Sequence, residues 1–176
     1  MNKNVFLKYS FIKSRKTLES LELETQLDKG YLSRVLNNHY EIKKERNLVK
    51  ICKALNINEN VFDLKADSFF LLFIDQFITS VYYIQEDRKN LYDTIISYEK
   101  KFKNTPYYLD ILLVKFVYSV VTKSFDESYE DVLNDLKSIV DVSDRSFKET
   151  FYVFWFGAMT LRSQLNKVQE FYEKCV

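Results

Sequence analysis

Apolar and polar residues alternate with a helical period along almost the whole chain. An apolar residue at i, i+3, i+4 and i+7 is the pattern of an amphipathic helix that buries one face. In the first part of the chain the pattern predicts four or five short helices. They are expected at 5–15, with Phe6, Leu7, Tyr9 and Ile12 inward, at 18–27 after Thr17, within 27–38, around the stripe of Leu48, Ile51, Cys52 and Leu55, and as a last short turn at 59–64.

The later part of the chain predicts longer helices with short polar connections between them. Its two most apolar stretches, 69–84 and 111–121, contain charged residues and are shorter than the roughly 20 apolar residues of a membrane span. We therefore interpret both as buried helices and expect no membrane partner. Helices are expected near 67–86, 88–103, 106–123, 126–141, 145–164 and 165–175.

The connections between these later helices contain residues that start helices. Pro106 suits the first position of a helix, and Asp126 and Asp144 can act as N-terminal caps. Short connections favour antiparallel neighbours, so this region is predicted to form helical hairpins. Because no clean 34-residue repeat is present, a stacked array of the TPR type and a plain bundle both stay open. Gly157, inside a predicted helix, suggests close packing of two helices.

The composition supports an all-α fold. The 176 residues include two glycines and one proline, and sheets need many more turn residues than that. We predict a DNA-binding domain at 1–65, made of the short helices, and a helical-hairpin region at 66–176. The first 63 residues carry a net charge of +4 and the remainder −3, which favours the first part as the binding site for a polyanion.

No residue pattern in the chain points to an enzyme. The chain contains none of the common motifs for nucleotide, metalloprotease, α/β-hydrolase or C-x-x-C redox sites. Cys52 and Cys175 have no metal-ligand spacing and suggest no disulfide framework. The N-terminus has no apolar run long enough for a secretory signal. We therefore expect a cytoplasmic protein that is not an enzyme and has no cofactor or metal.

The third predicted helix has two distinct faces. One face is apolar and anchors the helix, while the other is a row of hydrogen-bond donors and acceptors that suits the major groove of DNA. A short helix precedes it by only a few residues, as in a helix-turn-helix. The apolar face consists of Leu32, Val35 and Leu36, and the polar face of Lys29, Ser33 and Asn37 with Gly30 and Arg34 beside them.

Two sequence blocks resemble the Cro/C1-type (XRE-like) helix-turn-helix family. Residues 29–35, KGYLSRV, are similar to its recognition helix, and residues 48–57, LVKICKALNI, to its fourth helix and exit. The two blocks stand in the family's order and at its spacing. The chain differs at Leu18, Glu22 and Gln26, where the family usually has glutamine, a small residue and glycine.

The rest of the chain resembles the Rgg/MutR-like regulators, which join such a head to paired helices. The similarity lies in residues 127–161, where acidic residues precede an aromatic-rich helix that ends in FGAMTL, close to the family's Phe-Gly-small-x-Leu, and in Tyr40-Glu41-Ile42. This family is usually much longer. The resemblance implies a homodimeric, sequence-specific transcriptional regulator that binds double-stranded DNA and responds to a small peptide effector, as in quorum sensing.

The outward face and the resemblance together predict the residues that contact DNA. Gly30 is included because a missing side chain lets the backbone approach the nucleic acid closely. For Arg34, a role in supporting the fold is the alternative. The full set is Lys16, Thr17, Asp28, Lys29, Gly30, Tyr31, Ser33, Arg34, Asn37 and Asn38. A second function stays open, in which the chain is a helical peptide- or protein-interaction module with a vestigial DNA-binding head.

Overall fold

The computed structural model describes residues 3–65, 68–83 and 87–162, and every regular element in these ranges is helical. The all-α prediction is confirmed. The elements are α1 (Lys3–Ser14), α2 (Leu18–Thr25), α3 (Lys29–Leu36), α4 (Glu45–Ala54), η1 (Glu59–Phe62), α5 (Ser68–Tyr82), α6 (Arg88–Ser97), α7 (Glu99–Phe102), α8 (Tyr108–Thr122), α9 (Glu127–Ile139), η2 (Val140–Val142) and α10 (Arg145–Leu161). The helix expected at 165–175 lies outside the described residues.

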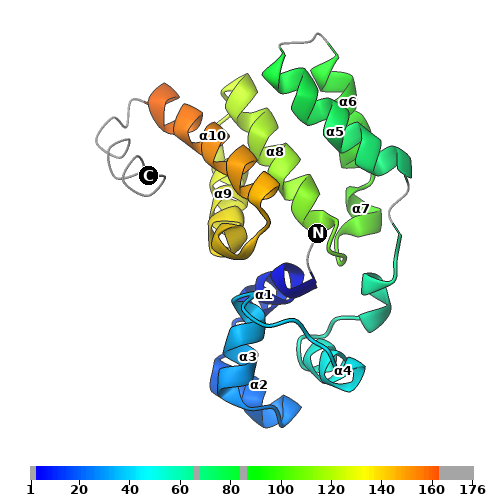
Figure 1. The fold of residues 1–176 in the computed structure, drawn as a ribbon. Helices are drawn as coiled ribbons and strands as arrows, with labels where there is room; N and C mark the ends of the chain where they lie inside the picture. Colours follow the sequence, from blue (N-terminus) through cyan, green and yellow to red (C-terminus); the bar gives the residue numbers. More distant parts are fainter. Residues whose placement is uncertain (1–2, 66–67, 84–86, 163–176) are drawn as a thin grey trace.

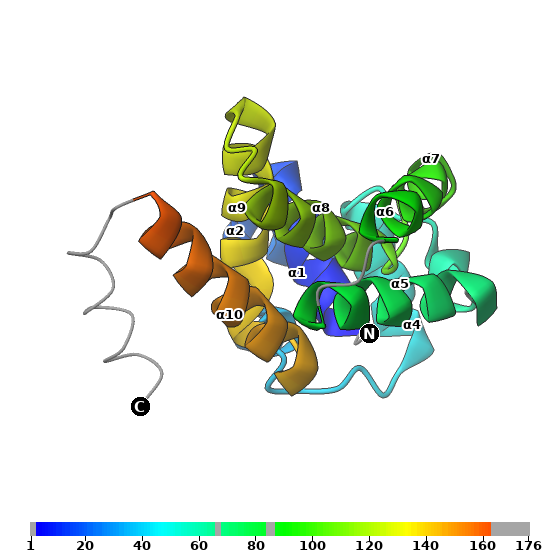
Figure 2. The ribbon, with the colours of Figure 1, turned by 90° about the horizontal axis from the view of Figure 1, so that it is seen from above.

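The helices form two groups that meet at α1 (Figure 1). We call α1 to η1 the head and α5 to α10 the body. In the body, α8 packs against α5, α6, α9 and α10, and Figure 2 shows these helices arranged around it. In the head, α2 packs against both α3 and α4. Because α1 packs against α3 and also against α9, it fixes the head on the body.

Two hydrophobic clusters correspond to these groups, and α1 contributes to both. Leu7 is fully buried with the head residues, while its neighbour Phe6 is buried with the body residues. Successive positions on a helix point about 100° apart, so one short helix can face both clusters. Ile12, expected to point inward, is 40% exposed. That expectation was wrong because it assumed a single buried face for α1.

Several helix boundaries follow the predicted caps. The side chains of Thr17, Asp126 and Asp144 each accept a hydrogen bond from a backbone N–H in the first turn of the next helix. These bonds satisfy donors that the helix itself leaves free. Several helices also end at a residue in the left-handed conformation, and with few glycines available, other residues take these positions: Arg15, Gln26, Asn38, Asn56 and Lys123.

The structure corrects three details of the body. The helix predicted at 88–103 is divided into α6 and α7 at Tyr98, whose ring packs against Phe70 with the ring centroids 5.3 Å apart. Helix α8 begins at Tyr108, so Pro106 precedes the helix and does not occupy its first position. Within the described residues, a Cβ atom on Gly157 would meet no atom of another element within 4 Å, so no tight contact with another described helix requires this glycine.

Candidate nucleic-acid interface

A tight connection joins α2 to α3. The Thr17 side chain accepts the Ser20 N–H at 3.1 Å and so starts α2. Gln26 ends α2 with φ of 55°, and its N–H donates to the Glu22 carbonyl at 2.8 Å. This left-handed conformation is strained for residues other than glycine. Three residues, 26–28, therefore reverse the chain between the two helices.

Helix α3 is anchored by its apolar face. Leu32, Val35 and Leu36 are all buried in the head cluster together with Leu21 of α2 and Ile51 of α4. The opposite side of the helix carries the polar residues. Lys29, Gly30 and Arg34 are exposed there, and Ser33 and Asn37 are partly exposed. The two faces predicted from the sequence are therefore present in the structure.

Two carboxylates cap the N-terminus of α3. Asp28 accepts the Tyr31 N–H at 2.8 Å, and Glu22 of α2 accepts the Lys29 N–H at 3.0 Å. Anions at this end of a helix compensate both its free N–H groups and its dipole. A Cβ on Gly30 would lie 3.1 Å from Asp28 Oδ1, so the glycine leaves room for the capping carboxylate. The cap therefore gives a structural reason for a glycine at position 30, in addition to the predicted close approach of the backbone to DNA.

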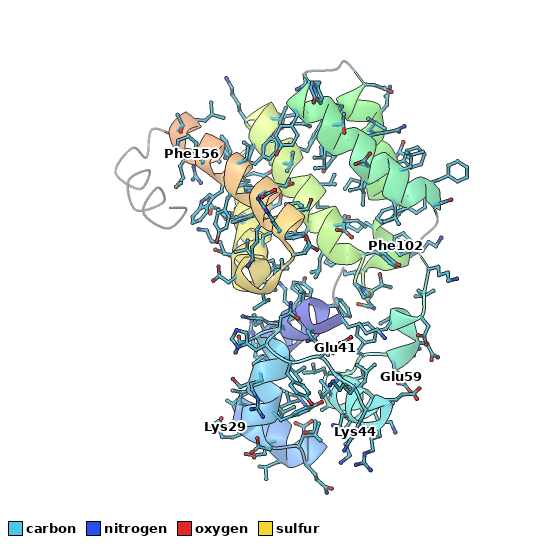
Figure 3. The ribbon with its side chains drawn as sticks, in the orientation of Figure 1. Lys29, Glu41, Lys44, Glu59, Phe102 and Phe156 are labelled. Carbon is cyan, nitrogen blue, oxygen red and sulfur yellow. The ribbon has the colours of Figure 1, made fainter. Side chains whose placement is uncertain are left out.

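The two lysines that were predicted to contact DNA both form ion pairs with glutamates of α2. Lys29 Nζ pairs with the Glu19 carboxylate, and Lys16 Nζ lies 2.5 Å from Glu24 Oε2 (Figure 3 labels Lys29). The hydrogen bond with Lys29 lowers the pKa of Glu19, and the one with Lys16 lowers the pKa of Glu24. Both carboxylates are therefore held in the charged form beside the lysines.

The end of α3 is tied to α1 and to the body. Asn37 accepts a hydrogen bond from Lys8 Nζ at 3.2 Å and donates one to Ser33 Oγ at 3.4 Å. Asn38 points away from the outward face, because its amide donates to the Val142 carbonyl of the body at 3.0 Å. The structure thus gives Asn38 a position at the contact between head and body rather than on the α3 face.

Tyr31 and Arg34 have contrasting surroundings. The Tyr31 hydroxyl accepts a hydrogen bond from Asn47 Nδ2 at 3.3 Å, and its ring contacts that of Tyr40 edge to face. Arg34 is exposed, and within residues 3–65, 68–83 and 87–162 no carboxylate pairs with its guanidinium. Of the predicted site residues, Arg34 is therefore the cation most available to an external ligand.

The α2–α3 unit is acidic although the head as a whole is basic. Residues 16–37 contain three Lys and Arg but four Asp and Glu, a net charge of −1. The remaining lysines and arginines of the head lie on α1, at Arg15 directly after it, and in residues 43–53. The roles of Glu19, Glu22 and Glu24 were missed from the sequence, where this stretch suggests only a solvated helix face. Lys29, which Glu19 and Glu22 bind, lies across the turn, and Lys16, which Glu24 binds, precedes α2, so helical spacing does not indicate these contacts.

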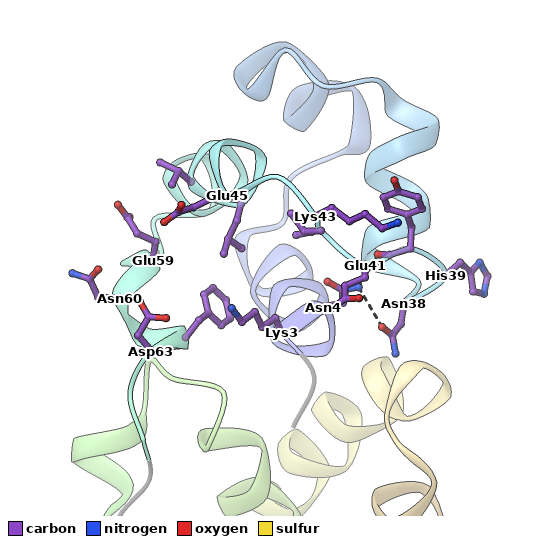
Figure 4. A pocket seen from close by; sticks show the side chains of 15 residues that line it. Lys3, Asn4, Asn38, His39, Glu41, Lys43, Glu45, Glu59, Asn60 and Asp63 are labelled. Carbon is purple, nitrogen blue, oxygen red and sulfur yellow. Dashed lines mark hydrogen bonds between the residues drawn. The ribbon is translucent and has the colours of Figure 1, made fainter.

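A groove of about 940 Å³ lies on another side of the head, between the α3–α4 connection, α4 and η1. Figure 4 shows Glu45 and Glu59 on one wall and Lys3 nearer the centre. Its charged lining consists of Lys3, Lys43, Glu41, Glu45, Glu59 and Asp63, so carboxylates outnumber lysines. This charge does not suit a polyanion.

Comparisons of the chain with known protein families, with curated proteins and with solved structures find no match. In the parts of the chain that the structure describes, no three His, Cys, Asp or Glu side chains are grouped as a metal site. Among the same residues no helix is long and apolar enough to cross a membrane. Cys52 is buried in the head cluster, and burial raises the pKa of its thiol to about 11, so it is a packing residue.

Proposed function

We propose that the protein is a sequence-specific DNA-binding transcriptional regulator that reads the major groove with α3. The observation that carries the proposal is the exposed Arg34 on a helix whose opposite face is fully anchored. An anchored helix that presents donors on its outer side, after a tight turn from a preceding helix, is the arrangement that helix-turn-helix proteins insert into DNA. Arg34 and Ser33 would contact base edges or phosphates from this face.

In this proposal the body is responsible for dimerisation and for the response to a peptide. One helix reads only a few base pairs, so two copies would bind half-sites about 34 Å apart as a homodimer. The exposed apolar residues Phe69, Leu71 and Leu72 of α5 support association of the body with a second copy. A peptide signal, which the family resemblance implies, would act on the head through contacts such as Tyr9 Oη to Asp135 Oδ2, 3.3 Å apart.

Replacement of Arg34 with alanine is expected to weaken binding to a selected DNA sequence by about ten- to a hundredfold, since one good base contact contributes about 1–3 kcal/mol. Duplexes would first be selected from a random pool with the wild-type protein, because the operator is unknown. Affinity is then measured by mobility shift at 0.15 M salt. The matched control is Arg145→Ala, which removes the same charge from an exposed position on the body.

The proposal predicts that Arg145→Ala binds the selected duplex like the wild-type protein. If Arg34→Ala and the wild-type protein bind the selected duplex with equal affinity, Arg34 does not contact the DNA. Failure of the wild-type protein to enrich any sequence would contradict sequence-specific binding as a whole.

A second function, a helical module that binds a peptide or protein, is favoured by the charge of the α2–α3 unit. Its net charge of −1 and the ion pairs of Lys16 and Lys29 reduce its attraction for phosphate. In this reading the α3 face is a vestigial DNA-binding surface. This second function would be favoured if the wild-type protein selected no DNA sequence and the Arg34→Ala variant still bound a protein partner.

A further inference from the structure

The carboxylates of α2 occupy positions where they compete with DNA. Glu19 pairs with Lys29 at the start of α3, and Glu24 pairs with Lys16 just before α2. Lys29 belongs to the outward face of α3, and Lys16 stands directly before the cap of α2. A phosphate that approached either lysine would therefore meet a glutamate already bound to it.

These ion pairs are weak enough to be exchanged. The Glu19 side chain is 63% exposed and that of Lys29 is 47% exposed, so water and salt screen their attraction. The pair therefore adds little to the stability of the fold. When a phosphate replaces Glu19 beside Lys29, however, the freed carboxylate remains close to the DNA and repels it. Replacement of Glu19 by a phosphate therefore lowers the affinity for DNA, although it hardly changes the stability of the fold.

We propose that Glu19 competes with DNA phosphate for Lys29 and thereby sets the affinity and the salt dependence of the interface. This inference rests on the proposed function and names a residue that controls it without itself contacting DNA. In the wild-type protein the negative charge of Glu19 beside Lys29 lowers the positive potential at this point, so Lys29 displaces less than one counterion from the DNA. Without the Glu19 charge, Lys29 would bind phosphate with full counterion release.

The test compares Glu19→Gln with the wild-type protein on a selected duplex across a range of salt concentrations. We expect Glu19→Gln to bind about three- to tenfold more tightly at 0.1 M salt. The slope of log K against log salt is expected to become steeper by about 0.9, the value for one additional phosphate contact. A structural effect of the substitution alone would not steepen this slope.

Two controls separate this effect from a general gain of positive charge. Glu149→Gln removes a carboxylate of similar exposure, 60%, which pairs with Arg145 on the body, and should leave the slope unchanged. Glu19→Asp keeps the charge and should bind like wild type. If Glu19→Gln and Glu149→Gln change affinity and slope equally, the inference is wrong and the proposed function stands.

The remaining outcomes are also decisive. Sequence-selective binding by Glu19→Gln with none by wild type would support the inference strongly, because the carboxylate would then hold the interface below detectable affinity. If neither protein selects any duplex, both the inference and the proposed function are contradicted.

Discussion

Replacement of Phe116 with alanine is expected to lower the free energy of unfolding by about 3–5 kcal/mol. Phe116 is fully buried on α8, and its ring stacks against those of Tyr129 and Phe151, with centroids 5.8 and 5.2 Å away. The substitution removes these contacts and leaves a cavity among helices that all pack against α8. Since small domains are stable by only about 5–15 kcal/mol, this is a large fraction of the total.

Urea unfolding followed by circular dichroism would measure this loss. The matched control is Phe69→Ala on α5, because the Phe69 side chain is 62% exposed and its removal leaves no cavity in the core. We expect a loss below about 1 kcal/mol for this control. Similar losses for the two variants would mean that Phe116 is not at the centre of the body core.

Replacement of Leu32 with alanine is expected to cost about 2–5 kcal/mol and to disrupt the DNA-reading helix. Leu32 is fully buried in the head cluster with Leu21 of α2 and Ile51 of α4, so it anchors the face opposite Arg34. A loosened α3 would no longer hold its outer residues in a fixed geometry. The same substitution should therefore reduce both the stability of the head and the affinity for a selected duplex.

The control for Leu32 lies on the preceding helix. Leu23 is 81% exposed on α2, and Leu23→Ala removes the same atoms without opening a cavity. Thermal unfolding and mobility shift of the two variants would be compared with wild type. If Leu32→Ala kept full stability, or if Leu23→Ala lost as much, the described anchoring of α3 would be incorrect.

The sequence predicted the elements of this fold well where local chemistry determines them. The helical period located α1 to α4, and Thr17, Asp126 and Asp144 marked helix starts because a short polar side chain can bond the first free N–H groups. The division between α6 and α7 was not predictable, since it accompanies packing of Tyr98 on Phe70, far away along the chain. The helical period carries no information on such contacts.

The candidate site shows the same difference between local and distant information. The apolar and polar faces of α3 follow from residue spacing, so Leu32 and Arg34 were placed correctly on opposite faces. The partners of Lys29, Lys16 and Asn38 depend on how the chain folds back on itself. Sequence spacing alone therefore suggested that these side chains are available to DNA, whereas in the structure they are bonded to other residues of the protein.

The most direct test of the central claim is to map which amide signals of the protein change when a selected duplex is added. Two-dimensional NMR spectra of the labelled protein would be recorded with and without that duplex at 0.15 M salt. If α3 reads DNA, the largest shift changes are expected in residues 28–37, which form α3 and its two caps. Changes concentrated in the body or in η1, with the α3 signals unmoved, would contradict the claim that α3 reads DNA.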